Sequence, residues 1–362
     1  MSNDPRDLSG FKLQQAMLKL GRDTQLRAEL IEWLKQVERR ADYQGSVRDD
    51  ITGPVIDALH TETDVYEKTL DNGTRFQFLY RTKIARDFLL AEREHPSHVW
   101  EPQTTRLLSH LLSHSTADVL IGGAYFGDHA ILLGRQLANA DRLVHCFEPN
   151  TDQVAMLAKN AQLNGLNNLR IQQLGLWHES SQRLRLDGFD SFANTVLADE
   201  SDEGFETIKI DEYCAAQQRS LSLLMIDIEG AELSALQGAQ NVLKRDKPAI
   251  VFEVHREYVD WSEGLLKTPI GSFLTGFGYQ IYAIRDFNAN REMGERCIEL
   301  IPAESVYLDG PPHGFNMLAV ADGALIEYPL FRIVRNVSPK LLRHKSPELH
   351  HPLDGFPEVA AR

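Results

Sequence analysis

The chain has 362 residues, of which 43% are hydrophobic and 25% are charged, a composition typical of a globular protein with a buried apolar core. Its formal net charge of −14 disfavours a nucleic-acid partner, because polyphosphate-binding surfaces gather lysine and arginine side chains. The three cysteines, Cys146, Cys214 and Cys297, are too few and too far apart for a disulfide framework or a metal cluster.

Two further features indicate a cytoplasmic protein. No stretch approaches the ~18 apolar residues of a membrane-spanning helix. The first residues lack the apolar run of a secretory signal, and widely spaced cysteines fit a reducing compartment. We therefore expect a soluble, cytoplasmic protein without a membrane partner.

Residues 24–40 repeat apolar side chains at helical spacing and predict an amphipathic helix. Its apolar stripe consists of Leu26, Leu30, Trp33, Leu34 and Val37. We interpret Trp33 as a packing residue and assign it no role in ligand binding.

A β-hairpin is predicted within residues 65–80, because Asn72 and Gly73 stand between two segments of alternating polarity. This hairpin and the helical pattern before it belong to a predicted amino-terminal extension, residues 1–98. We expect the extension to cap a ligand cleft or to build a contact in a homodimer.

From about residue 99 onward, apolar strand-like runs alternate with helical patterns. The predicted strands are residues 117–122, 143–148, 169–173, 222–227, 249–254, 279–284 and 316–321. The predicted helices are residues 128–139, 151–164, 231–244 and 264–276. This alternation predicts an α/β domain over residues 99–325, with a mostly parallel sheet covered by helices on both faces.

Residues 326–362 combine prolines and charges without periodicity and therefore predict a C-terminal tail. Within this tail we interpret His350 and His351 as solvated residues rather than metal ligands.

The first strand-to-helix turn of the α/β domain is rich in glycine. Gly123 and Gly127 would let the backbone pass close to a ligand, and the following helix offers free N–H groups to an anion. Gly122, Ala124 and Gly127 also fit the dinucleotide pattern G-x-A-x-x-G. The turn alone therefore does not choose between nucleotide ligands.

Glu148 ends the second predicted strand, beside the glycine turn. A carboxylate at this position can accept both hydrogen bonds of a ribose diol. The turn and Glu148 together predict a nucleoside-containing ligand.

Acidic residues follow two later strands. Asp227 ends the predicted strand 222–227, and Glu229 lies in the acidic turn after it. The next predicted strand, 249–254, brings Glu253 and His255 to the same edge. Because side chains alternate along a strand, we expect Glu253 and His255 on one face. Four titratable groups at one sheet edge are more than stability requires, so they indicate chemistry.

Six segments resemble the FkbM-type methyltransferase family, within the S-adenosylmethionine-dependent class I fold. They are residues 99–108, 121–127, 147–150, 159–166, 227–232 and 252–255. The resemblance implies a seven-stranded Rossmann-like sheet whose final strand runs antiparallel. It also implies S-adenosylmethionine as cofactor and O-methylation of a sugar or natural-product hydroxyl.

The resemblance also suggests a set of site residues. Those expected to contact the cofactor are Gly123, Ala124, Tyr125, Phe126, Gly127, Glu148, Pro149, Leu176, Trp177 and Asp227. Leu176 and Trp177 would sandwich the adenine ring. The catalytic candidates are His255, Asp227, Glu229 and Glu253.

One turn departs from the family, which usually reads D-x-G-A-N-x-G. Here Ile121 replaces the acidic residue and Tyr125 replaces the asparagine. The lost carboxylate usually helps to hold the methionine end of the cofactor, so this contact must come from elsewhere. Asp128 lies nearby, and Tyr125 or Phe126 can present an aromatic face to the sulfonium.

For an alcohol acceptor we predict His255 as the base, because its reference pKa lies near neutrality and Glu253 can raise its basicity. Asp227 is the alternative, as base or as an anchor for the acceptor. A divalent metal bridging Asp227, Glu229 or Glu253 would suit carboxylates. The spacing does not demand it, so we predict no metal.

Two other functions remain open from the sequence. The altered glycine turn motivates a catalytically silent paralogue that binds the cofactor or a partner as a scaffold. The same turn and Glu148 motivate an NAD(P)-dependent oxidoreductase, which leaves the acidic residues after the later strands unexplained.

Overall fold

The computed structural model describes residues 5–43, 45–187, 194–197, 204–286, 290–308, 314–342 and 345–355. It divides into two compact units, which are treated separately. Unit 1 comprises Met1–Glu67 and Gln77–Leu90. Unit 2 comprises Lys68–Phe76 and Ala91–Arg362.

Unit 1 is mainly helical. Its helices are α1 (Pro5–Gly21), α2 (Thr24–Arg40), the short π-helix η1 (Arg48–Thr52), α3 (Gly53–Asp57) and α4 (Lys83–Leu89). The predicted helix over residues 24–40 is confirmed, and Asp23 caps it by accepting hydrogen bonds from the amides of Gln25 and Leu26. This follows the usual preference for an aspartate before the first turn.

The predicted apolar stripe of α2 is wrong for Leu26 and Trp33, whose side chains are 47% and 57% exposed. The buried residues of α2 are Ile31 and Leu34. At about 100° per residue, Trp33 lies roughly 100° around the helix from Leu34. The face of α2 that packs into the small core of unit 1 is centred between Ile31 and Leu34. The apolar stripe in the sequence therefore does not coincide with the buried face of the helix.

The predicted hairpin is confirmed as β1 (Val65–Thr69) and β2 (Arg75–Leu79). Its turn needs a left-handed residue, which Gly73 supplies with φ of 79°. The Asn72 side chain stabilises the turn by accepting hydrogen bonds from the amide and the hydroxyl of Thr74.

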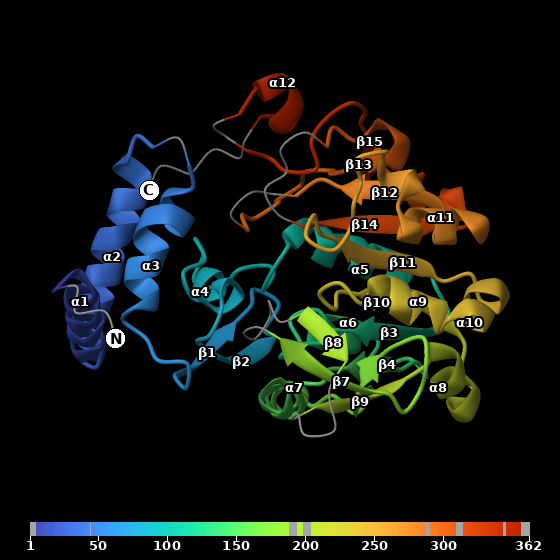
Figure 1. Ribbon diagram of the computed structural model, residues 1–362, viewed down its shortest axis with the longest axis horizontal. Coiled ribbons are helices and arrows are strands. Elements are labelled where there is room, and N and C mark those ends of the chain that lie inside the picture. The colour runs from blue at the N-terminus through green and yellow to red at the C-terminus, as the bar shows by residue number, and fades with distance from the viewer. Residues whose placement is uncertain are drawn as a thin grey trace. The chain divides into compact units, whose positions relative to one another are not determined.

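The core of unit 2 is a nine-stranded sheet (Figure 1). In spatial order its strands are β15 (Phe331–Ile333), β13 (Ile298–Pro302), β12 (Gln280–Ile284), β14 (Phe315–Val320), β11 (Ala249–Val254), β10 (Leu221–Ile226), β3 (Asp118–Gly122), β4 (Val144–Phe147) and β5 (Leu169–Gln172). The strands from β11 to β5 are parallel to one another, and β14 is antiparallel to both of its neighbours.

The mostly parallel α/β fold and all seven predicted strands are therefore confirmed, including the antiparallel final strand β14. The expected number of strands is corrected from seven to nine. The two additional strands, β13 and β15, extend the sheet beyond β12. β15 has three residues, too short to show a period in the sequence.

Helices cover both faces of the sheet. The helices α8 (Ile210–Gln217), α9 (Glu232–Gln237), α10 (Gln240–Arg245) and α11 (Pro269–Gly276) pack on one face and share its apolar core (Figure 1). The others are α5 (Pro102–Ser113), α6 (Ala130–Gln136) and α7 (Thr151–Leu163). The predicted helix over 231–244 is two helices, because α9 ends at Gln237, with Gly238 as its C-cap.

A second, four-stranded sheet was not predicted. Its strands are β6 (Gly175–Leu176), β9 (Phe205–Ile208), β7 (Arg183–Asp187) and β8 (Asn194–Leu197).

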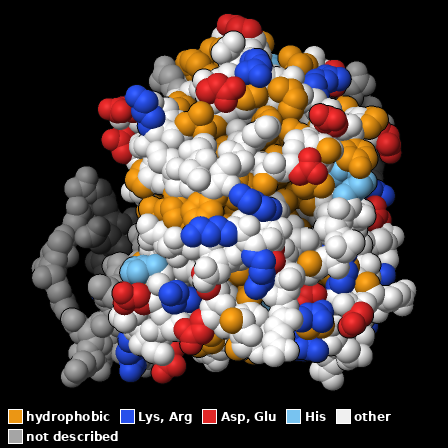
Figure 2. Space-filling model, turned by 90° about the vertical axis from the view of Figure 1, so that its right-hand side faces the viewer, with side chains coloured by type: hydrophobic (Ala, Val, Ile, Leu, Met, Phe, Trp, Pro, Cys, Tyr) orange, Lys and Arg blue, Asp and Glu red, His pale blue; other side chains and the backbone are white. Residues whose placement is uncertain are grey.

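On the face of the molecule in Figure 2, acidic and basic side chains are interspersed, and neither sign forms a continuous patch.

The segment predicted as a C-terminal tail includes β15 and α12 (Pro347–His350) and belongs to unit 2. The fully buried Arg285 holds it, since its guanidinium donates to the carbonyl oxygens of Ser338 (2.8 Å), Leu349 (3.2 Å) and His351 (3.1 Å). The interpretation of His350 as a solvated residue is wrong, because its ring is 4% exposed.

Among the described residues, no helix is both long enough and apolar enough to cross a lipid bilayer.

Candidate functional site

The carboxyl ends of β4, β3, β10 and β11 meet at one edge of the large sheet. The register aligns Phe147 with Gly122, Gly122 with Ile226, and Ile226 with Phe252. The residues that follow these positions therefore emerge side by side. They include the glycine turn, Glu148, Asp227 and Glu253, as predicted for the parallel sheet.

The glycine turn crosses over the end of β10. Gly123 has φ of 77°, and a Cβ atom on it would lie 1.8 Å from the carbonyl oxygen of Asp227. Only glycine fits here, for both backbone and steric reasons. The amides of Gly123 and Ala124 donate to the Phe147 carbonyl at 2.9 and 3.0 Å, which ties the turn to the end of β4.

Glu148 is 7% exposed and holds two backbone segments together. Its Oε2 accepts from the Tyr125 amide at 2.9 Å, and its Oε1 accepts from the Asn150 amide at 2.9 Å. Asn150 in turn caps α7, and the half-buried Pro149 lies between the two. A carboxylate oxygen carries two lone pairs and can accept more than one hydrogen bond.

The two aromatic residues of the turn differ in their surroundings. Phe126 is 1% exposed, and its ring meets that of Phe76 edge-on at a centroid distance of 6.3 Å. The Asn160 side chain donates to the Phe126 carbonyl at 2.9 Å. Phe126 is thus a core residue beneath the turn, whereas Tyr125, at 9% exposed and φ of 46°, lies closer to the surface.

Leu176 and Trp177 also differ. Leu176 is 3% exposed and packs on Gly122, where a Cβ atom would lie 2.7 Å from its Cδ1. Trp177 is half-buried, and its amide donates to the Ile208 carbonyl at 3.2 Å. Of the two, Trp177 is the more exposed residue.

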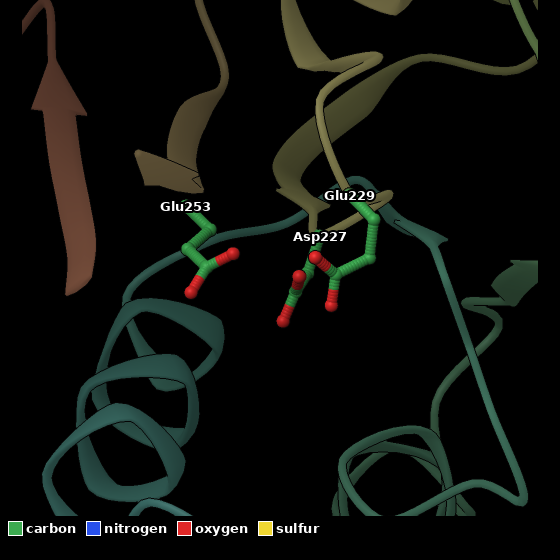
Figure 3. Close-up of side chains that lie close together, drawn as sticks. All are labelled: Asp227, Glu229 and Glu253. Carbon is green, nitrogen blue, oxygen red and sulfur yellow. The ribbon is translucent and has the colours of Figure 1, made fainter. Parts of the chain in front are cut away.

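Asp227, Glu229 and Glu253 form a carboxylate cluster (Figure 3). One carboxylate oxygen of each lies within 4.8 Å of the others. Glu229 reaches the cluster from a left-handed turn, with φ of 49°. Glu232 holds this turn by accepting hydrogen bonds from the amides of Ile228 (3.0 Å) and Gly230 (3.2 Å).

Burial and mutual repulsion keep most of the cluster protonated near neutral pH. Burial, with the charge of Asp128, raises the pKa of Asp227 to about 6. Burial, then Asp227 and Glu232, raise the pKa of Glu229 to about 8. Burial, then Asp227 and Glu229, raise the pKa of Glu253 well above its ordinary value. Asp227 is therefore the member that ionises first, among neighbours that retain their protons.

His255 lies next to the carboxylate cluster but outside it. Its Cδ2 and the Glu253 Oε1 both crowd Gly314, where a Cβ atom would lie 2.9 and 2.2 Å away respectively. The two side chains are thus on the same side, as predicted. However, β11 ends at Val254, and His255 begins a turn in which its Nδ1 accepts from the Glu257 amide at 3.1 Å.

Two residues near the carboxylate cluster were missed by the sequence analysis. Glu101 precedes α5, and Asn316 lies in β14 directly opposite Glu253. The Asn316 Nδ2 donates to the Glu101 Oε2. Asn316 could have been singled out because it is the one polar residue in the apolar run FNMLAV.

The carboxylate cluster is the group of described residues that could hold a divalent cation, since carboxylate oxygens suit Mg²⁺ and Ca²⁺. Protons compete with a cation for the same oxygens. The prediction of no metal stays a prediction.

Residues 122–293 match the family model for the methyltransferase FkbM domain. The chain carries an FkbM methyltransferase domain. The matched span begins at the last residue of β3 and contains the glycine turn, Glu148 and the carboxylate cluster. The resemblance that these segments suggested is confirmed, and the oxidoreductase alternative is disfavoured.

Comparison with solved structures gives distant neighbours of the FkbM domain. Methyltransferase FkbM from Methylobacillus flagellatus KT is 15% identical, with 56% of this chain and 43% of that chain covered and a TM-score of 0.35. The tRNA (uracil-54, C5)-methyltransferase of Pyrococcus abyssi, in complex with S-adenosyl-L-homocysteine, is 14% identical, with 72% and 44% covered and a TM-score of 0.35.

An rRNA methylase from Streptococcus thermophilus is 8% identical, with 60% of this chain and 93% of that chain covered and a TM-score of 0.33. The chain thus spans less than half the length of the first two neighbours. At such TM-scores none of the three bears on the chemistry of the site. The search of curated protein sequences gave no match.

Proposed function

We propose that the FkbM domain uses S-adenosylmethionine to methylate a hydroxyl of a small polar acceptor, of the sugar or natural-product type. The observation that carries the proposal is the carboxylate cluster beside the glycine turn, in which one carboxylate ionises among protonated neighbours. An alcohol must lose its proton to become a methyl acceptor, and a carboxylate of raised pKa is suited to take it.

The residues at the sheet edge fit a nucleoside-containing cofactor. At Gly123 the backbone has no side chain to block a close approach, and the Glu148 carboxylate lies beside the glycine turn, where a ribose diol can be recognised. Trp177 offers a ring face for the adenine. Ile121 is buried and uncharged where the family has an acid, so we assign the ionic contact with the methionine end to Asp128, which is 8% exposed.

When bound, S-adenosylmethionine supplies a methyl group that is already activated by the adjacent sulfonium. The protein then has to align the acceptor and accept its proton. We assign the base to Asp227 rather than His255, because Asp227 lies within the carboxylate cluster and His255 uses its Nδ1 in a turn. The Asp227 carboxylate would accept the proton of the acceptor hydroxyl.

Because their pKa values are raised, we assign Glu229 and Glu253 the role of hydrogen-bond donors in the proposed reaction. As neutral acids they can donate hydrogen bonds to the acceptor or to Asp227 without adding charge. The site therefore concentrates its negative charge on Asp227.

We propose a small-molecule acceptor rather than a nucleic acid, and a cytoplasmic location. The net charge of −14 supports the first, and the three free cysteines support the second. We also propose that unit 1 builds a contact between two copies of the chain in a homodimer.

The experiment that tests the proposal joins binding to turnover. Calorimetry of the purified chain should detect S-adenosylhomocysteine and S-adenosylmethionine but not NAD. Mass spectrometry should then detect a mass gain of one methyl group in a panel of sugars and glycosylated metabolites. Binding without transfer to any acceptor would instead support the silent scaffold that the Ile121 and Tyr125 replacements motivate. Saturable binding of NAD alone would overturn both.

A further inference from the structure

Glu101 stands at a junction between α5 and the large sheet. It occupies the residue before Pro102, at the start of α5, with φ of 43°. A left-handed backbone is unfavourable for a glutamate, so surrounding contacts must hold this residue in place. Burial, and after it the charge of Asp227 in the carboxylate cluster, raises the pKa of its carboxyl group.

Asn316 connects Glu101 to the carboxylate cluster. It is 5% exposed, and the register places it opposite Glu253, so the two side chains share a face of the sheet. Its Nδ2 donates to Glu101 and, at 3.3 Å, to the Thr104 hydroxyl. Its Oδ1 is buried and accepts no hydrogen bond from the described residues. A neighbouring carboxyl group can satisfy that oxygen only if it carries a proton.

The charges around Glu101 come from several elements, and most are negative. Asp227 follows β10, Glu253 lies in β11, and Asp286 follows β12. A cation that acts on Glu101 is Lys340, from the C-terminal segment. Lys340 is already paired, since its Nζ lies 2.6 Å from Asp286. An ionised Glu101 would thus add a negative charge next to other acids, while Lys340 is paired with Asp286.

We infer that Glu101 is a positioning residue of the proposed methyl-transfer site, and that it acts as a neutral carboxylic acid. One oxygen accepts from Asn316, and the other carries a proton that is donated into the carboxylate cluster. This role keeps Asp227 as the principal anion and fixes the orientation of the amide opposite Glu253. The inference rests on the proposed function. The direction of the Glu101 pKa, which burial and then Asp227 raise to about 8, agrees with it.

The test compares Glu101→Gln, which keeps the shape and a hydrogen-bond donor, with Glu101→Ala, which removes both. A matched control is Glu292→Gln. Glu292 accepts from the amide of Ser97 at 2.9 Å and thus anchors the same segment, but its described partners are Ser97 and His98. Infrared difference spectroscopy at pH 7 reads the protonated carboxyl groups directly and needs no acceptor.

Glu101→Gln should remove one protonated-carboxyl signal at pH 7, whereas Glu292→Gln should leave the signal unchanged. With an acceptor in hand, Glu101→Gln should keep kcat within about threefold. Glu101→Ala should lower it on the order of tenfold, the rate equivalent of one hydrogen bond to a charged group. S-adenosylhomocysteine affinity should stay within about threefold in both.

An unchanged infrared signal in Glu101→Gln would show that Glu101 is ionised at pH 7 and would overturn the inference. So would a loss of kcat in Glu101→Gln as large as in Glu101→Ala. If Glu101→Ala fails to fold, the infrared signal and the kcat of Glu101→Gln decide the matter. Failure of the proposed function appears instead in the wild-type chain, as an absence of S-adenosylhomocysteine binding or of turnover.

Discussion

The acidic residues at the two ends of the central strands have opposite pKa shifts. At the amino edge, Asp118 begins β3 and is paired with Arg219 (2.5 Å) and His145 (3.0 Å), and these partners hold its pKa below the ordinary value despite burial. At the carboxyl edge, the carboxylate cluster has no cation of its own among its described partners, and its pKa values rise.

The contrast separates stability from chemistry within one sheet. A buried acid that is matched by cations and hydrogen bonds contributes to the folded state. Acids that are crowded together without cations cost folding free energy, and such arrangements are typical of functional sites. The following predictions test whether the two edges divide these tasks, from the largest expected effect to the smallest.

The largest effect is expected for Asp227→Asn. Loss of the base should lower turnover by about 10²–10⁴ while the melting temperature is maintained or rises. Single-turnover kinetics on a known acceptor would measure it, with Asp260→Asn as control, an exposed acid beyond β11. If His255→Ala suffers this loss and Asp227→Asn does not, the base is His255, as the sequence first suggested.

A smaller effect is expected for Glu148→Ala. It removes charge-assisted hydrogen bonds worth about 1.5–3 kcal/mol, so S-adenosylhomocysteine affinity should fall at least about tenfold. Because Glu148 also accepts from the amides of Tyr125 and Asn150, the melting temperature should fall as well. Calorimetric titration and a melting curve measure the two separately. An unchanged dissociation constant would restrict Glu148 to holding the turn.

At the amino edge, Asp118→Asn should cost stability without affecting chemistry. Breaking the pairs with Arg219 and His145 should lower the free energy of unfolding by about 2 kcal/mol, less than for a fully buried pair because Arg219 is partly exposed. Denaturant titration measures the change. A loss of turnover at a temperature where the variant is folded would contradict the separation of the two edges.

The smallest effect concerns the pH dependence of stability. Folded-state pKa values at the carboxyl edge are raised, so the folded state binds more protons there, and stability falls as pH rises from about 4 through the range 6 to 8. Asp118 behaves inversely, and its contribution is lost only as pH falls through its lowered pKa. Glu253→Gln should therefore raise stability by about 1 kcal/mol at pH 8 and have little effect at pH 5.

Thermal melts across this pH range would check the prediction, with Glu304→Gln as an exposed control. A stabilisation that is equal at pH 5 and pH 8 would mean that repulsion within the carboxylate cluster is not its cause.

The sequence pattern alone was sufficient to predict the strands that are buried on both faces of the sheet. The buried parallel strands are continuous apolar runs, and acids placed directly after them, such as Asp227, could be located from chain position alone. His255 was harder, because alternation holds only within extended backbone and β11 ends one residue earlier.

Other features depend on contacts that have no local signature. The buried face of α2 is set by what packs on it, so Trp33 could not be placed from periodicity. The C-terminal segment is ordered by the Arg285 guanidinium, which contacts carbonyl oxygens more than 50 positions away in the sequence. Glu101 and Asn316 are separated by 215 positions, and only the fold brings them together.

The insertion of β14 between β11 and β12 has a consequence for how the chain assembles during synthesis. β12 is made before β14, yet it is separated from β11 by the strand that arrives later. Until residue 320 has left the ribosome, β11 presents an open edge and β12 lacks its inner neighbour. The sheet cannot close in the order in which it is translated, so a nascent chain halted near residue 293 would expose unpaired backbone and be prone to aggregation.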